Sequence, residues 1–134
     1  MTKTKFALML ILSLLLPCLL YTSLLAFIHA ILPNSVKSKF GEEVFERAKK
    51  AAHNFAESLP IFFVLAILSI YLSVEENELV ALIWLCLRII FGIIYVSGIN
   101  TKPADSKGYQ AQPIRSLVWI GSIICLIDMA TNLT

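Results

Sequence analysis

Four polar residues lie at helical spacing in the segment that leads into the second apolar run of the chain. They are Arg47, Lys50, Asn54 and Glu57. Their separations of three, four and three residues place them within ~80° of one another on an α-helix, as one polar stripe. A position at the level of the lipid headgroups explains Arg47 and Lys50 equally well. It explains Asn54 and Glu57 less well, because the chain is already entering an apolar run there.

Arg88 is the most costly charge in the sequence. It lies inside the apolar run Leu79–Val96, with nine residues before it and eight after it. An ionised side chain near the centre of a bilayer costs at least ~2.5–3.5 kcal/mol on insertion scales, so it usually faces the interior of a helix bundle. We therefore expect a buried ion pair between Arg88 and Glu57. Tyr95 follows seven residues later, within ~20° of the same helix face.

A third polar group opens the last apolar run, as Pro113-Ile114-Arg115-Ser116. Proline suits the first turn of a helix, so Arg115 and Ser116 should lie near a helix N-terminus. Taken alone, Arg115 fits equally well as a side chain that extends to the headgroups.

Brought together, these side chains offer an excess of cations, several hydrogen-bonding groups and one carboxylate. Such a set suits a small peptide with two carboxylates and one amine. The sequence shows no pair of nucleophile and base, so a nucleophile would have to arrive with the ligand. The set consists of Lys50, Asn54, Glu57, Arg88, Tyr95, Arg115 and Ser116.

The composition requires that these residues be positioned by membrane helices. Of 134 residues, 58% are hydrophobic and 15% charged, with a mean hydropathy of +0.82, whereas soluble domains are ~25% charged. These values exclude a disordered chain, and a net charge of +2 does not indicate a nucleic-acid partner.

Four apolar runs are long enough to cross a ~30 Å hydrocarbon core as helices. We expect spans at about 6–32, 55–73, 79–97 and 114–132, within a single domain of residues 1–134. The predicted fold is all-α, an integral membrane four-helix bundle. A cleaved signal peptide is the alternative for the N-terminus, but the first run is about twice the ~7–15 residues of a signal core.

Basic residues set the expected orientation, because they favour the cytoplasmic side of a membrane. The first connection and its helical extension carry five of them, and the third carries Lys102 and Lys107, whereas Val74–Glu78 has three Glu and none. Both termini are thus expected outside the cytoplasm, although Lys3 and Lys5 oppose this. The segment Gly98–Gln112 is typical of a flexible loop. The Cys and His residues show no metal-site spacing, so no metal is expected.

Three motifs, taken together, resemble the MAPEG family, the membrane-associated proteins in eicosanoid and glutathione metabolism. The resemblance covers roughly Glu42–Trp119. Many members are bacterial, so the expected location is a bacterial inner membrane or its equivalent. Family members form trimers with sites between neighbouring subunits, which implies a homotrimer here. The motifs are Glu46-Arg47…Lys50-Ala51…Asn54…Glu57…Pro60, Arg88 followed by Tyr95, and Pro113-Ile114-Arg115-Ser116.

The resemblance implies glutathione as the bound thiol and a lipophilic small molecule, dissolved in the membrane lipid, as the second substrate. Arg115 would contact the glutathione sulfur with Ser116 beside it, and this pair would be catalytic. Lys50 stands where the family has an Arg that grips a carboxylate, and it lacks the bidentate fork of Arg. Glu57 would face the amino group. The implied glutathione-binding set is Lys50, His53, Asn54, Glu57, Arg88 and Tyr95.

The activity implied is that of a glutathione transferase or peroxidase. A free thiol, with a pKa near 8.5, is only a few per cent ionised at neutral pH, and a guanidinium at the sulfur stabilises the thiolate. Two other classes of function stay open. A non-catalytic relative would retain the fold and its buried polar pairs for stability. A small-solute transporter subunit would favour discontinuous helices or inverted repeats, and the sequence indicates neither.

Overall fold

The computed structural model describes residues 2–103, 105–108 and 111–134, with the backbone alone for residues 7–14. Over this part the chain forms the helices α1 (Lys3–Phe40), α2 (Glu42–Tyr71), α3 (Glu76–Ser97) and α4 (Pro113–Asn132), and no strand. Each helix is long and apolar enough to cross a membrane. The predicted all-α membrane four-helix bundle is confirmed.

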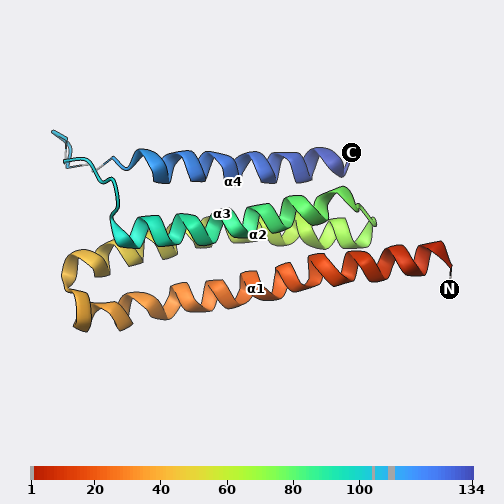
Figure 1. The fold of residues 1–134 in the computed structure, drawn as a ribbon, viewed down its shortest axis with the longest axis horizontal. Coiled ribbons are helices and arrows are strands. Elements are labelled where there is room, and N and C mark those ends of the chain that lie inside the picture. Colours follow the sequence, from red (N-terminus) through yellow and green to blue (C-terminus); the bar gives the residue numbers. More distant parts are fainter. Residues whose placement is uncertain (1, 104, 109–110) are drawn as a thin grey trace.

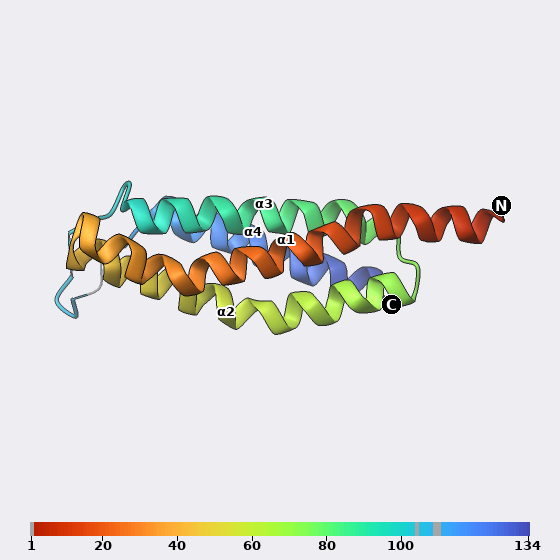
Figure 2. The same ribbon diagram turned by 90° about the horizontal axis from the view of Figure 1, so that it is seen from below.

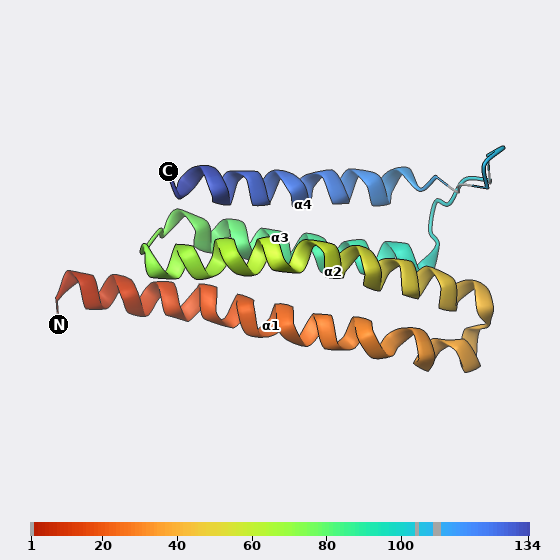
Figure 3. The ribbon, with the colours of Figure 1, turned by 180° about the vertical axis from the view of Figure 1, so that it is seen from behind.

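The helices run side by side in a bundle with α2 and α3 between α1 and α4 (Figures 1 and 2). Within the described part, α1 and α4 do not pack against each other. Both chain ends lie at the end of the bundle that holds the α2–α3 turn, and the other two connections lie at the opposite end (Figure 3). This arrangement gathers the C-terminal end of α3, the N-terminal end of α4 and the N-terminal half of α2 at one end of the molecule.

The first connection is much shorter than the basic loop that the sequence suggests. Helix α1 continues through Pro33 to Phe40, and α2 starts at Glu42. Gly41 makes the turn with φ +87° and donates its N–H to the carbonyl of Lys37 at 3.2 Å. Helices α1 and α2 therefore extend beyond the apolar runs, since their polar ends can continue as helix outside the hydrocarbon.

Aromatic stacking forms the centre of the core. The Phe62 and Trp84 rings are parallel, with centroids 3.9 Å apart, and Phe55 continues the stack at 6.3 Å from Trp84. At the end with the chain termini, Asn77 donates to the Ser69 hydroxyl at 2.7 Å and to the carbonyl of Met129 at 3.0 Å. This polar contact ties α2, α3 and α4 together far from the predicted site.

Gly98 closes α3 in a conformation that depends on the absence of a side chain. It has φ +72°, in the left-handed region, and an added Cβ would lie 3.1 Å from the guanidinium carbon of Arg47. Arg47 in turn donates its Nε–H to the carbonyl of Val96 at 3.1 Å, which satisfies one of the free carbonyls at the end of α3. Arg47 therefore has a structural contact that the sequence stripe did not indicate.

We expect Gly98→Ala to lower the free energy of unfolding by ~2 kcal/mol, because it combines left-handed strain with displacement of Arg47. The matched control is Gly108→Ala, which has φ +79° and nothing within 4 Å of the added Cβ. Thermal unfolding in detergent should show the larger loss for Gly98→Ala. Equal losses would mean that the Arg47 contact contributes nothing.

Candidate functional site

The predicted polar stripe of helix α2 lies beside the face that packs against the other helices. Ala51, Phe55 and Ser58 are buried against the other helices, whereas Asn54 is half-buried at the edge of this face. Glu57 lies further round, with a side chain 66% exposed, and its carboxylate is 3.2 Å from Nε2 of His53. Within the predicted stripe, the Asn54 amide therefore lies toward the bundle interior, whereas the Glu57 carboxylate lies on its outside.

Arg88 lies inside the bundle, with 1% of its surface exposed to solvent. Its hydrogen-bond partner is Asn54. Its Nη2 donates to Oδ1 of Asn54 at 2.8 Å, and its guanidinium lies over the rings of Phe91 at 4.6 Å and Phe55 at 5.4 Å. Among the described residues, Nε and Nη1 have no hydrogen-bond partner. The guanidinium is therefore held mainly by aromatic faces and one amide oxygen.

The predicted ion pair between Arg88 and Glu57 is wrong for the described chain. Residues three apart on a helix differ by ~60° in direction. At the level of Arg88 this difference leaves Asn54 facing α3 and turns Glu57 outward, where it meets His53. Arg88 consequently fixes the amide of Asn54 and leaves Glu57 available to the outside of the chain.

A cavity of about 440 Å³, which we call the inner cavity, brings together residues from three helices. Asn54 reaches it from α2, Tyr95 from α3, and Arg115 and Ser116 from the start of α4. The Arg115 guanidinium lies over the Tyr95 ring, 4.3 Å from its centroid. The apolar part of its wall consists of Phe91, Trp119 and Ile120. The expected convergence of Asn54, Tyr95 and Arg115 on one space is what the structure shows.

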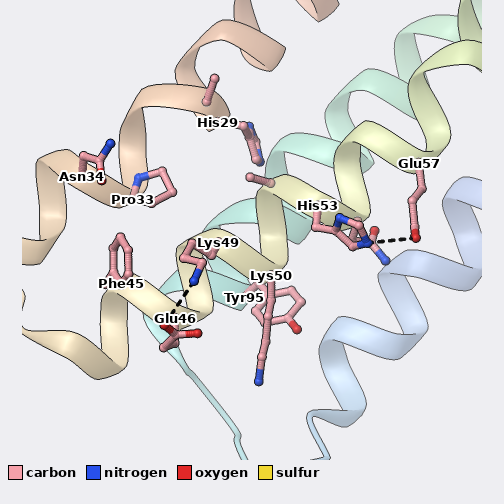
Figure 4. Close-up of a pocket in the computed structure, with 13 residues that line it drawn as sticks. His29, Pro33, Asn34, Phe45, Glu46, Lys49, Lys50, His53, Glu57 and Tyr95 are labelled. Carbon is pink, nitrogen blue, oxygen red and sulfur yellow. Dashed lines mark hydrogen bonds and ion pairs between the residues drawn. The ribbon is translucent and has the colours of Figure 1, made fainter.

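A larger polar groove of about 820 Å³ runs between α1 and α2 (Figure 4). Lys50, His53 and Glu57 line it on the α2 side, and Tyr95 reaches it from α3. A small cavity of about 120 Å³ is lined by Arg47, Lys50, Tyr95 and Arg115, among others. Tyr95 lines all three spaces and Asn54 lines two of them, so the polar groove and the inner cavity adjoin at these two residues.

The structure thus places seven of the eight predicted site residues on the walls of two spaces in one region of the bundle. Asn54, Tyr95, Arg115 and Ser116 share the inner cavity, and Lys50, His53 and Glu57 lie on the polar groove. Arg88 lies behind Asn54 and lines none of the cavities described here. The lysine next to the set, Lys49, pairs with Glu46 at 3.4 Å on a half-exposed surface, as expected for a solvated position.

Gln112 is a residue of this region that the sequence did not indicate. It is 1% exposed, and its Nε2 donates to the carbonyls of Ile94 at 2.8 Å and Ile99 at 2.5 Å. Its Oε1 accepts a hydrogen bond from Nη1 of Arg115 at 3.4 Å. Gln112 therefore fastens the start of α4 to the end of α3 and orients Arg115.

The segment Gly98–Gln112, expected to be a flexible loop, is held at both ends. Besides the Gln112 contacts, the amide of Lys102 donates to the carbonyl of Ala111 at 2.7 Å. Residues 104, 109 and 110 of this segment lie outside the described residues. The spacing between Tyr95 and Arg115 is thus set by specific hydrogen bonds.

We expect Gln112→Leu to weaken any ligand interaction of Arg115 by ~3–10-fold, because the loss of its hydrogen bonds loosens the α3–α4 junction. The helices themselves should persist in circular dichroism. Ligand affinity and thermal unfolding of the purified protein would measure the two effects. An unchanged affinity would show that Arg115 is positioned by its other contacts alone.

Fold and site together define a multi-pass membrane protein with a polar, open candidate binding region near one end of a four-helix bundle. A sequence model of the MAPEG family matches residues 6–133, nearly the whole chain. The chain belongs to the MAPEG family, as the three motifs predict. Comparisons with curated proteins and with solved structures give no match. Family membership associates the chain with glutathione-related membrane proteins, and the activity has to be argued from the site.

Proposed function

We propose that this protein is a membrane-embedded, glutathione-dependent transferase or peroxidase. The observation that carries the proposal is the inner cavity, where the guanidinium of Arg115 and the hydroxyl of Ser116 share one space with Asn54 and Tyr95. A cation and a hydroxyl donor beside a cavity suit the stabilisation of a thiolate better than the attack of a protein nucleophile.

Glutathione recognition would use the polar groove. The tripeptide has two carboxylates and one amine. Lys50 can bind a carboxylate, and Glu57, turned outward and paired with His53, can accept the ammonium group. Tyr95 and Asn54 line both the groove and the inner cavity. A ligand held by the groove could therefore extend its thiol toward Arg115.

The chemistry required of the protein is modest. Binding next to Arg115 favours the thiolate over the thiol, and the thiol proton leaves to water. Lowering the thiol pKa by two units takes only ~2.7 kcal/mol of differential stabilisation. The thiolate sulfur then attacks an electrophilic carbon of a lipophilic molecule from the membrane lipid, and a C–S bond forms as the leaving group departs with its electron pair. With a lipophilic hydroperoxide, the sulfur attacks the terminal oxygen, the O–O bond breaks to release the alcohol, and a second glutathione converts the resulting sulfenic acid to glutathione disulfide and water.

A homotrimer with sites between subunits is part of the proposal. In a single chain the polar groove is open, and the side chains of His53 and Glu57 are 81% and 66% exposed. Exposed charges at the wall of a membrane bundle favour cover by another polar surface. A neighbouring subunit would supply that cover.

The orientation proposed places the site on the cytoplasmic side of a bacterial inner membrane or its equivalent. The end of the bundle with the site holds the last turn of α1, which carries Lys37 and Lys39, and the α3–α4 connection, which carries Lys102 and Lys107. Both termini lie at the other end (Figure 1). The excess of basic residues favours the cytoplasmic side for the site.

Titration of the purified protein with glutathione tests the proposal. We expect a rise in thiolate absorbance together with a higher melting temperature, since a ligand at 100 times its Kd stabilises the folded state by ~2.7 kcal/mol. S-Methylglutathione is the matched control and should stabilise the protein without the absorbance change. A melting temperature that neither ligand changes would instead favour a non-catalytic family member.

A further inference from the structure

The cavity of about 120 Å³, which we call the basic cavity, has no role in the proposed reaction as described so far. Three cationic side chains line it: Arg47 and Lys50 from α2 and Arg115 from the start of α4. Among the described residues that line it, none is acidic. Cations gathered without a counter-charge repel one another, and a bound anion relieves that repulsion. The cavity therefore suits a compact anionic group.

Arg47 is held in place at the basic cavity by two contacts within the protein. Its Nε donates to the carbonyl of Val96 and its Nη1 to the carboxylate of Glu43, both at 3.1 Å. The Arg47 side chain is 23% exposed and that of Glu43 80%, so the ion pair lies mostly in solvent and is weak. Neither contact uses Nη2. The guanidinium is thus pre-positioned and retains N–H groups for an anion in the cavity that it lines.

Lys50 connects the basic cavity with the polar groove. It lines both spaces, as Tyr95 does, and its side chain extends beside Tyr95 (Figure 4). Unlike Lys49, which pairs with Glu46, Lys50 forms no ion pair with an acidic residue of the described chain. A ligand in the polar groove can therefore place one anionic end in the basic cavity, next to Lys50.

The spacing of charges along α2 matches the length of a tripeptide. Lys50 and Glu57 are seven residues apart, which is ~10 Å along a helix and nearly the same helix face. Three residues of extended chain span about the same ~10 Å. Glutathione carries its amine at the γ-glutamyl end and a single carboxylate at the glycine end. With the amine at Glu57, the glycine carboxylate reaches the level of Lys50 and the basic cavity.

We propose that the basic cavity binds the glycine carboxylate of glutathione, and that Arg47 is a specificity-determining residue for that carboxylate. This inference rests on the proposed function and adds Arg47 to its ligand-binding residues. Lys50 lacks the bidentate fork of an arginine. Arg47, three residues earlier on the same helix, supplies that fork. The cavity consequently selects a ligand that is anionic at this end over one that is neutral there.

Glutathione and its glycine ethyl ester, which lacks that one charge, test the proposal by calorimetric titration of the full-length protein in detergent. We expect the unsubstituted protein to bind glutathione at least ~10-fold more tightly than the ester, as for a hydrogen-bonded charged group. Arg47→Gln should reduce this affinity ratio ~3–10-fold and leave the affinity for the ester unchanged. Glutamine can still donate to the Val96 carbonyl, so the variant removes the charge and not the helix contact.

Lys39→Gln is the matched control for the loss of one positive charge. Lys39 is exposed in the last turn of α1, at the same end of the bundle, and lines none of the three spaces of the site. This variant should leave both affinities unchanged.

Thr101 offers a second pair of variants that leaves Arg47 in place. It lines the basic cavity from the α3–α4 connection. Thr101→Glu puts a carboxylate among the cations and should lower the affinity ratio ~10-fold, to about that expected when the cavity is already neutralised. Thr101→Gln adds a side chain of the same size without the charge and should lower the ratio less. If Arg47→Gln fails to fold, this pair decides.

An unchanged affinity ratio in Arg47→Gln, or an equal loss of affinity for both ligands, would overturn the proposal, since the second result is that of a purely structural residue. Equal ratios in Thr101→Glu and Thr101→Gln would do the same. If the unsubstituted protein binds glutathione and the ester equally, the basic cavity does not hold the carboxylate, whereas the proposed function stands because glutathione binds. If it binds neither ligand, the proposed function fails and the role of Arg47 with it.

Discussion

Replacing Arg115 with alanine should abolish most of the thiolate absorbance that glutathione gives on binding. The guanidinium borders the inner cavity with Ser116, and it is the one cationic group among the described residues that line this cavity. Without it the bound thiol returns toward its ordinary pKa near 8.5, at which only a few per cent is ionised at pH 7. If Arg115 lowers that pKa by two units, the thiolate fraction falls roughly 20-fold. Absorbance titration at pH 7 measures the change directly.

Glutathione affinity should fall less than the thiolate fraction in Arg115→Ala, because Lys50 and Glu57 on the polar groove are unchanged. Arg115→Lys keeps a cation and should retain part of the thiolate. Tyr95→Phe is the control for the ring under the guanidinium, since it keeps the 4.3 Å cation–π contact and removes the hydroxyl. Unchanged thiolate absorbance in Arg115→Ala would refute the role proposed for Arg115.

The elements that position the site could be predicted from sequence because each depends on local signals. The four apolar runs are long enough to span a membrane as helices. A helix is the one structure in which a single run satisfies its own backbone hydrogen bonds within lipid. Glu42 and Pro113 are suited to helix N-termini, and α2 and α4 begin at these two residues. The convergence of Asn54, Tyr95 and Arg115 was predicted from polar residues in or at the start of three apolar runs, together with the resemblance to MAPEG proteins.

The interactions that the sequence missed depend on groups that only the fold brings together. Asn54 and Glu57 lie on one stripe, and spacing cannot decide which of them faces Arg88, because a ~60° rotation exchanges them. Gln112 donates to the carbonyls of Ile94 and Ile99, which only the fold brings next to it at the end of α3. His29 packs closely against Gly92 of another helix, where an added Cβ would lie 3.2 Å from Nε2 of His29. None of these partners is visible in the spacing of residue types.

The largest stability effect should come from Asn54→Leu, which leaves the buried guanidinium of Arg88 without its one hydrogen-bonded side chain. Nη2 would join Nε and Nη1, which already have no partner among the described residues. Loss of a hydrogen bond to a buried charged group costs ~1.5–3 kcal/mol. We therefore expect Asn54→Leu to lower the free energy of unfolding in detergent by about that amount.

The double variant Asn54→Leu/Arg88→Met separates the cost of the unpaired charge from the cost of altered packing. Methionine is long enough to lie between Phe55 and Phe91, where the guanidinium now lies, and brings no charge. Replacing a buried polar pair with apolar groups of similar volume is often neutral or stabilising. The double variant should thus unfold at a higher temperature than Asn54→Leu alone, while both lose glutathione affinity. If the double variant were the less stable of the two, Arg88 would be stabilised by its aromatic neighbours and not by Asn54.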